Sequence, residues 1–195
     1  EAQLGENENM SQNVTIINSG TNLYASQVGF LFSPVRFRYR ALNQKYNEVF
    51  VNGAPANDIE SGQFRFSHVG GLNQQTKNAD FALPFESNSF TMPDMAGSNN
   101  YDFRPANQAA GHRFTLGGAN RNYTLRGMYT YNSGLTKNGW AFSGNLTYRW
   151  AKEGYIEGTF YNALSYFFGV QKVFGNKDKH SIAFSTWGNP TERAS

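Results

Sequence analysis

The stretch that decides the fold runs from Asn138 to Trp150 and reads NGWAFSGNLTYRW. Its even positions, from Trp140 through Tyr148 to Trp150, are apolar or aromatic apart from one Gly, whereas the odd positions between them are Ala, Ser, Asn, Thr and Arg. Side chains of a β-strand alternate between its faces, so this pattern predicts one apolar and one polar face. Trp and Tyr place their rings in hydrocarbon and their polar tips among headgroups. Trp140, Tyr148 and Trp150 are therefore predicted to be membrane-interface residues.

Four further segments repeat the alternation, and together with Asn138–Trp150 they predict about five antiparallel strands. Phe167 weakens the contrast between the two faces of its segment, and the first of the four is the weakest example. The segments are His112–Leu116, Tyr123–Tyr131, Leu164–Gln171 and Ser181–Trp187.

Arg126, Asn145 and Arg149 lie on the polar sides of these predicted strands. A charge on the lipid side of a membrane strand costs about 2 to 4 kcal/mol near the bilayer midplane. We therefore predict that these three residues face a water-filled lumen.

The connections between the strands differ in length. Gly134–Gly139 and Gly175–Lys179 are short and polar, whereas 151–161 is longer and carries aromatic residues. A membrane barrel combines short periplasmic turns with longer extracellular loops, so this alternation favours a barrel. Tyr155, Phe160 and Tyr161 of the longer connection have two interpretations: contact with an incoming ligand, or anchoring at the membrane interface, which we prefer.

The chain changes character near Gly111, and we predict one domain over 1–110 and a second over 111–195. In the first, alternation predicts short strands at Val35–Arg40 and Glu48–Val51, and Asn52-Gly53 predicts a turn after the second. The remainder reads as long loops around a small core, with one short helix near Leu72–Asn78. The fold class predicted for this part is a small α+β domain.

Composition excludes several classes of protein. No run of about 18 to 20 apolar residues occurs, which excludes a helical membrane protein. The net charge of +3 is small and diffuse, so we expect no nucleic-acid partner. The chain has no Cys, and its His68, His112 and His180 do not stand at metal-ligand spacing. No nucleophile or nucleotide motif is present, so we expect no catalytic residues, metal or cofactor, and no enzyme activity.

The order of several motifs is similar to one family. The run Arg36-Phe37-Arg38-Tyr39-Arg40, followed by Val49–Asp58, resembles the plug-domain core of TonB-dependent outer-membrane receptors in the form common among Bacteroidetes. Tyr131–Trp140 and Glu153–Tyr161 resemble the opening barrel strands and first long loop of the same group, and Lys179–Ile182 and Gly188–Arg193 continue the likeness. Departures are Ala41, where the family usually has Gly, and Gly97–Tyr101, where it usually has paired glycines and Asn-Ile.

The resemblance implies a mainly β protein, with a plug domain followed by the opening antiparallel strands of a transmembrane β-barrel of about 22 strands. It implies an outer-membrane receptor that takes up a scarce ligand when its plug is displaced by energy from the inner membrane. The implied partners are a TonB-type energy-transducing complex, outer-membrane lipid and a small ligand such as a siderophore, vitamin, peptide or glycan. One branch of the family also pairs with a surface lipoprotein, but that branch has Val-Asp-Gly where this chain has Val51-Asn52-Gly53.

Within this resemblance, the plug core motif consists of Arg36, Arg38 and Arg40 with Asn52 and Gly53. The three arginines share one face of the predicted strand, where they can pair with acidic residues of the barrel wall. Such buried charges must be matched, because an unmatched one costs several kcal/mol. The other interpretation is a solvated strand face.

Two alternatives remain open for the whole chain. One is a soluble or surface-anchored β-sandwich that binds a ligand, because sandwich strands also alternate. The other is a small membrane-barrel enzyme or adhesin of about eight to ten strands.

Overall fold

The computed structural model describes residues 42–76, 79–82, 91, 95–118, 123–154, 157–175 and 180–193. Of these, 42–67 and 76–102 belong to one compact unit, and 68–75 and 103–193 to a second. The secondary structure is mainly strand; the helical elements of the described residues are the short 3-10 helices Gln44–Tyr46 (η2), Phe66–Val69 (η3) and Pro105–Asn107 (η4). None of the described helices combines the length and the apolar character that a membrane span requires.

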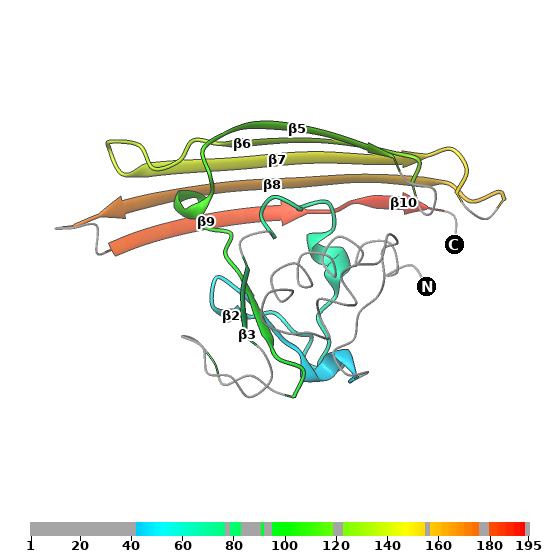
Figure 1. Ribbon diagram of the computed structural model, residues 1–195, viewed down its shortest axis with the longest axis horizontal. Coiled ribbons are helices and arrows are strands. Elements are labelled where there is room, and N and C mark those ends of the chain that lie inside the picture. The colour runs from blue at the N-terminus through cyan, green and yellow to red at the C-terminus, as the bar shows by residue number, and fades with distance from the viewer. Residues whose placement is uncertain are drawn as a thin grey trace, which may run out of the picture. The chain divides into compact units, whose positions relative to one another are not determined.

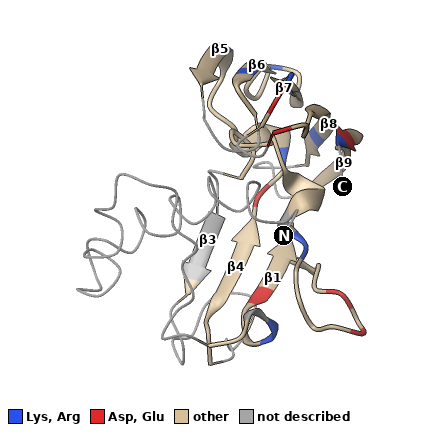
Figure 2. Ribbon diagram, turned by 90° about the vertical axis from the view of Figure 1, so that its right-hand side faces the viewer, with Lys and Arg blue, Asp and Glu red and all other residues tan. Residues whose placement is uncertain are grey.

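The first unit contains a four-stranded sheet in the order β2-β1-β4-β3. Its strands are Glu48–Val51 (β1), Ala54–Pro55 (β2), Ala79–Ala82 (β3) and Ser98–Tyr101 (β4). β1 and β4 run parallel to each other (Figure 2), whereas the other two pairs are antiparallel. The strand predicted at Glu48–Val51 is confirmed, while the one predicted at Val35–Arg40 lies outside the described residues.

The turn between β1 and β2 is formed by Asn52 and Gly53, as predicted. Both have positive φ, 53° and 81°, which is the conformation of a type I′ hairpin turn and the reason for an Asn-Gly pair. The Gly53 N–H donates a hydrogen bond to Asn100 Oδ1 on β4 at 2.9 Å. The turn is thus tied to the strand that runs beside β1.

The loop after β2 is held by two polar side chains. Asn57 Oδ1 accepts a hydrogen bond from the Val49 N–H at 2.7 Å, and its Nδ2 donates to the carbonyl oxygen of Gly62 at 2.8 Å. Asp58 accepts hydrogen bonds from the backbone N–H and the hydroxyl of Ser61, each at 2.8 Å. These hydrogen bonds lower the pKa of the exposed Asp58 carboxyl below its ordinary value of 3.8, and the bond from the Ser61 backbone N–H has the largest effect.

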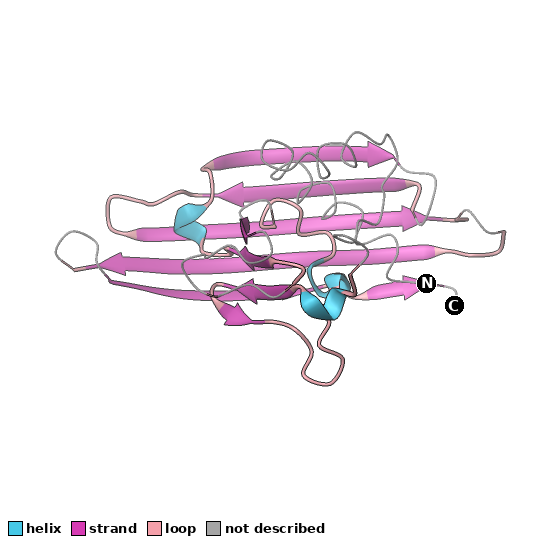
Figure 3. Cartoon of the chain, turned by 60° about the horizontal axis from the view of Figure 1, so that its bottom comes forward, coloured by secondary structure: helices cyan, strands magenta, loops and turns pink. Residues whose placement is uncertain are grey.

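The second unit contains a larger, antiparallel sheet that follows the chain as a meander from β5 to β9 (Figures 1 and 3). All strands predicted in this part of the chain are confirmed. Their bounds are Gly111–Gly118 (β5), Leu125–Asn132 (β6), Trp140–Ala151 (β7), Tyr161–Phe174 (β8), His180–Gly188 (β9) and Thr191–Arg193 (β10).

β9 and β10 share one edge of β8 and are separated by Asn189 and Pro190. The Pro190 ring removes a backbone N–H donor, which interrupts the ladder. Its carbonyl oxygen still accepts a hydrogen bond from the Leu164 N–H at 3.0 Å. The two short strands therefore act as one interrupted edge strand beside β8.

The short helix predicted near Leu72–Asn78 is wrong for the part that the structure describes. Residues 73–76 form turns, and the nearby helical element is instead η3, four residues of 3-10 helix. Gly70 and Gly71 precede these turns, and Gly71 has φ of 79°, a left-handed conformation that ends helical structure. The α+β character predicted for the first part is accordingly not seen: its described residues form strands, loops and 3-10 turns.

Candidate functional site

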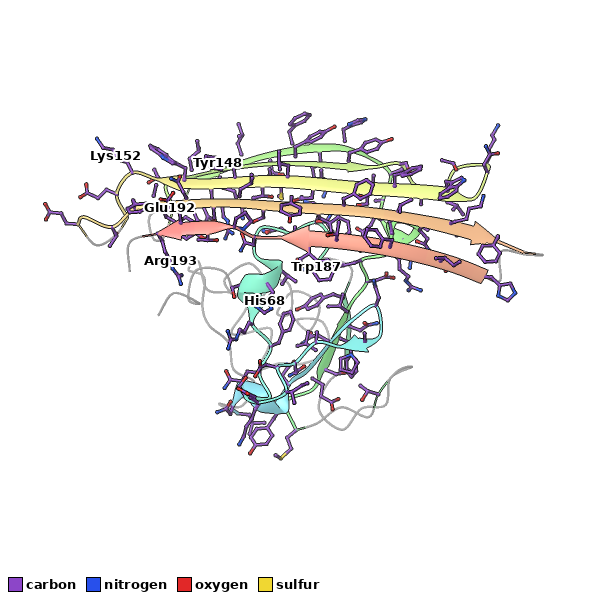
Figure 4. The ribbon with its side chains drawn as sticks, turned by 180° about the vertical axis from the view of Figure 1, so that it is seen from behind. His68, Tyr148, Lys152, Trp187, Glu192 and Arg193 are labelled. Carbon is purple, nitrogen blue, oxygen red and sulfur yellow. The ribbon has the colours of Figure 1, made fainter. Side chains whose placement is uncertain are left out.

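The sheet of the second unit exposes its apolar side chains, and we call this side the aromatic face. Phe142, Leu146 and Tyr148 on β7 are 39%, 52% and 49% exposed, whereas Ala141 and Thr147 on the opposite side are 0% exposed. Figure 4 shows Tyr148 and Trp187 on opposite sides of the sheet. The other large exposed residues of the aromatic face are Phe114, Leu116, Leu125, Tyr129, Tyr131, Trp140, Trp150, Leu164, Tyr166, Phe168, Phe174, Ile182 and Phe184.

Charges on the aromatic face are confined to its two ends. Within β5–β10 they are Lys172 and Glu192. Lys172 is the cross-strand partner of Trp140 at one end. Glu192 pairs with Asn162, which in turn pairs with Trp150 at the other end. Lys172 Nζ lies 5.0 Å from the centroid of the Trp140 ring. The ten residue steps between the tryptophans span about 33 Å, or about 23 Å at a 45° tilt, close to the apolar band of about 25 Å on membrane barrels.

The opposite side of the sheet, the polar face, carries buried polar side chains that hydrogen-bond across the strands. Asn145 Nδ2 donates to Thr130 Oγ1 at 2.7 Å, and Ser143 Oγ donates to Asn132 Oδ1 at 2.5 Å. Thr147 Oγ1 lies 3.1 Å from Asn145 Oδ1. These residues are at most 9% exposed, so the sheet buries polar groups and exposes apolar ones, the reverse of a soluble sheet.

Residues 68–75 of the same unit cover part of the polar face. Thr147 Oγ1 donates a hydrogen bond to the carbonyl oxygen of Gly71 at 2.7 Å. A methyl group added to Gly71 would lie 2.7 Å from Ser165 Cβ, so the backbone approaches the sheet more closely than any other residue type permits. Leu72, the next residue, is 1% exposed.

Residues 103–108 cover a second part of the polar face. The ring of Phe103, 0% exposed, meets the rings of Phe167 and Trp187 edge-on, with centroids 5.6 and 5.2 Å away. The Ala106 N–H donates to Gln171 Oε1 at 2.9 Å. Two chain segments thus cover part of the polar face, one with a close backbone approach and the other with an aromatic cluster.

Two arginines lie side by side on the polar face. Arg126 on β6 and Arg149 on β7 are direct cross-strand partners. Arg149, 4% exposed, donates to Asn189 Oδ1 at 2.9 Å and to Ser165 Oγ at 3.3 Å, and its Cζ lies 5.6 Å from the ring centroid of Tyr161.

Arg126 is less completely satisfied than its neighbour. Its Cζ lies 6.0 Å from the ring centroid of Tyr123, and its Nε and Nη1 atoms are buried without a hydrogen-bond partner in the described part of the chain. The two side chains extend toward different neighbouring strands, since the Arg126 guanidinium lies over Gly117 on β5 and that of Arg149 reaches Ser165 on β8.

The predicted site residues fall into four groups. Arg126, Asn145 and Arg149 lie on the polar face, and Trp140, Tyr148 and Trp150 lie on the aromatic face, as the alternation predicted. Asn52 and Gly53 form the β1–β2 turn of the first unit. Four predicted residues lie outside the described part of the chain, namely Arg36, Arg38, Arg40 and Tyr155.

The two remaining predicted residues, Phe160 and Tyr161, lie in different surroundings. Phe160 lies in the connection between β7 and β8 and is 39% exposed, whereas Tyr161 is the first residue of β8 and is 7% exposed on the polar face. Tyr161 packs with Ala151 and Ala163, and Tyr123 packs against this cluster. The expectation that Tyr161 belongs to the loop is therefore corrected.

Sequence reasoning missed the residues that complete the polar face. Ser165 Oγ donates to Asn189 Oδ1 at 2.6 Å, which joins β8 to the break between β9 and β10. Gly71 and Phe103 come from segments that are distant in sequence. The one signal was Asn189-Pro190, which marks an interruption of an edge strand.

Two of the histidines, His112 and His180, belong to aromatic clusters of the second unit. In the described residues no group of three or more His, Cys, Asp or Glu side chains could hold a metal ion. His112 Nδ1 lies 2.9 Å from the Tyr129 hydroxyl on the aromatic face, and His180 begins β9 next to Phe174. Both rings are part of aromatic clusters at strand ends.

Comparison with protein-family models, with curated proteins and with solved structures finds no match to this chain.

Proposed function

We propose that this chain is part of an outer-membrane receptor and transporter whose second unit contributes strands to a transmembrane β-barrel. The observation that carries the proposal is the inverted sheet: its aromatic face is exposed, and its polar face is largely buried and hydrogen-bonded along β6, β7 and β8. Each large apolar side chain gains about 1.5 to 3 kcal/mol on leaving water, so a wide apolar surface requires a cover. Lipid is the cover that suits a face bounded at both ends by Trp with polar or charged neighbours.

The proposal includes further strands that close the sheet. β5 and the β9–β10 pair are the sheet edges among the described residues. A strand edge in hydrocarbon leaves backbone groups without partners at several kcal/mol each, so membrane sheets close into barrels. The resemblance of the sequence to TonB-dependent receptors supports a barrel of about 22 strands.

The proposed transport step is supported by what covers the polar face. Residues 68–75 and 103–108 cover part of it, and their removal would expose a polar surface to water. We propose that a TonB-type complex pulls on the plug after a ligand binds from outside. The protein's own residues then bind, orient and release the ligand without chemical change.

The membrane assignment is tested by two leucines of equal exposure. Leu146 lies mid-strand on the aromatic face and is 52% exposed, and Leu135 lies in the turn between β6 and β7 and is 49% exposed. Leu146→Arg should reduce the amount of assembled, heat-modifiable protein in outer membranes, because an arginine near the midplane costs about 2 to 4 kcal/mol. Leu135→Arg should assemble normally.

A soluble sandwich gives the opposite result. Both leucines would face water, and arginine would be tolerated at each within about 0.5 kcal/mol. Equal assembly of the two variants, with recovery of the protein in the soluble fraction, would therefore refute the proposal and favour the sandwich.

A further inference from the structure

The two ends of the large sheet differ in charge on the aromatic face and in the connections. Among the described residues, the end with the β6–β7 turn carries Lys137 and Lys172 and no acidic residue. The end with the longer 152–160 connection carries Lys152 together with three acidic residues, namely Glu153, Glu157 and Glu192. Figure 4 shows Lys152 and Glu192 at the same end of the sheet. We call the end with Lys137 and Lys172 the basic rim.

Lys172 is held at the basic rim by two contacts. Its Nζ lies 5.0 Å from the centroid of the Trp140 ring and donates a hydrogen bond to the carbonyl oxygen of Asn138. An ammonium group has three N–H donors, so the bond to Asn138 leaves it able to donate to an acceptor from outside the protein. Because Trp rings collect at the level of lipid headgroups, the contact with Trp140 places this positive charge at that level.

His180 provides a second polar group next to Lys172. It pairs with Phe174, two residues along β8 from Lys172, so that its side chain is a diagonal neighbour of Lys172 on the aromatic face. The His180 ring centroid lies 5.9 Å from that of Phe174. The imidazole also packs against Gly175, where an added methyl group would lie 3.1 Å from its Cδ2 atom. An ammonium group and an imidazole thus lie near each other at the rim.

The residues between the rim and the middle of the sheet are apolar. Phe142, two residues from Trp140 on the same face of β7, is 39% exposed, and Ile182, the cross-strand partner of Lys172 on β9, is 68% exposed. A molecule whose anionic group contacts Lys172 therefore has apolar surface beside it. This combination favours an amphiphile over a free inorganic anion, because burying the apolar side chains adds to the attraction between the charges.

From this arrangement we infer that Lys172, with His180 and Trp140, binds the headgroup phosphate of an anionic phospholipid whose acyl chains lie over Phe142 and Ile182. Lysine binds phosphate as a point charge, and basic residues beside a bilayer attract anionic lipids. The acidic residues at the opposite end repel the same lipids. The inference names a lipid class and one end of the sheet, and in that respect it rests on the proposed function.

The test uses tryptophan at each end of the sheet as a reporter. Trp150→Phe leaves Trp140 at the basic rim, and Trp140→Phe leaves Trp150 at the other end, while Trp187 on the polar face is present in both variants. Each purified variant is reconstituted in vesicles of phosphatidylcholine mixed with phosphatidylglycerol. One of the two lipids carries brominated acyl chains, which quench tryptophan fluorescence on contact. The ratio of the two quenching efficiencies gives the relative affinity for the lipids.

Trp140 should report a preference for phosphatidylglycerol of about fivefold, the ratio that one lysine near an anionic surface supplies, whereas Trp150 should report little preference. Lys172→Gln in the Trp150→Phe background should abolish the preference, and Lys172→Arg should retain it. Lys152→Gln is the matched control, because it removes the same charge from an exposed position at the opposite end. It should leave the preference at Trp140 unchanged.

The inference fails if Trp140 reports no preference, or if Lys172→Gln and Lys152→Gln alter the preference equally. It also fails if Trp150 reports the same preference as Trp140, since the lipid would then respond to the net charge of the protein and not to the basic rim. Failure of the proposed function gives a different result. Neither brominated lipid would then quench Trp140 or Trp150, whereas equal quenching by both lipids would remove only the lipid class.

Discussion

Gly71 brings the backbone of the segment 68–75 close to the polar face. It combines a positive φ of 79° with a carbonyl oxygen that accepts a hydrogen bond from Thr147. We predict that Gly71→Ala loosens this segment, because the added methyl group would lie 2.7 Å from Ser165 Cβ. Hydrogen exchange of the Leu72 N–H, which donates to the Val69 carbonyl oxygen at 3.1 Å, should become at least several-fold faster.

Gly158 supplies the control for that prediction. Its φ of 78° matches that of Gly71, but an added methyl group would meet no atom within 4 Å. Gly158→Ala therefore carries the same backbone strain, about 1 kcal/mol, without the steric conflict. If the two variants left Leu72 exchange equally slow, the close approach of Gly71 to the sheet would be contradicted.

At the level of single residues, the sequence predicted on which face of the sheet a side chain lies but not which residues lie next to it. Alternation was sufficient to place Arg126, Asn145 and Arg149 on the polar side. It could not show that Arg126 and Arg149 are opposite each other, because that depends on the register between β6 and β7. The partners of Arg149 depend in addition on the break at Asn189, whose effect on side-chain direction is not encoded in a periodic pattern.

Two neighbouring residues of β8 show how packing differs between the polar face and the aromatic face. Phe167 is 3% exposed and contacts the ring of Phe103, whereas its neighbour Phe168 is 50% exposed on the aromatic face. We predict that Phe167→Ala destabilises the protein by about 3 to 5 kcal/mol, the usual cost of emptying a packed site. Phe168→Ala should cost markedly less, because the space it leaves remains open to the surroundings of the sheet.

To compare the two variants, both are unfolded with urea in the same lipid vesicles, and unfolding is monitored by tryptophan fluorescence. Trp187, which also contacts Phe103, reports the state of the covering segment 103–108. Equal losses of stability for the two variants would mean that Phe167 does not anchor this segment.

At the level of elements, β5 to β9 were predictable because their residues alternate with a period of two, whereas the three-residue β10 was not predicted. The segments that cover the polar face were not predictable. Residues 68–75 contain Gly70, Gly71 and polar turn residues, and the helix predicted near Leu72–Asn78 overlapped their second half. Their structure is set by contacts with β7 and β8, about 75 to 95 residues further along the chain, which no local pattern can report.

For the molecule as a whole, the proposed function requires that the cover of the polar face can be removed. Ser165 tests this requirement, because it is 0% exposed and its Cβ lies directly opposite the backbone of Gly71. This chain contains no cysteine, so Ser165→Cys introduces a single thiol. We predict that a membrane-impermeant thiol reagent labels this variant in energised cells with ligand present, and that an uncoupler of the inner membrane prevents the labelling.

The same reagent should label Glu157→Cys whether or not the inner membrane is energised, because Glu157 lies exposed in the connection between β7 and β8. The ratio of the two labelling rates therefore isolates the movement of the cover from the access of the reagent to the cell surface. A mobile loop fluctuating thermally would expose the Ser165→Cys thiol equally with and without uncoupler, since thermal motion requires no energy source. That result would leave a membrane sheet with a polar face but would remove energised transport, because the contacts closing the face would then open unaided.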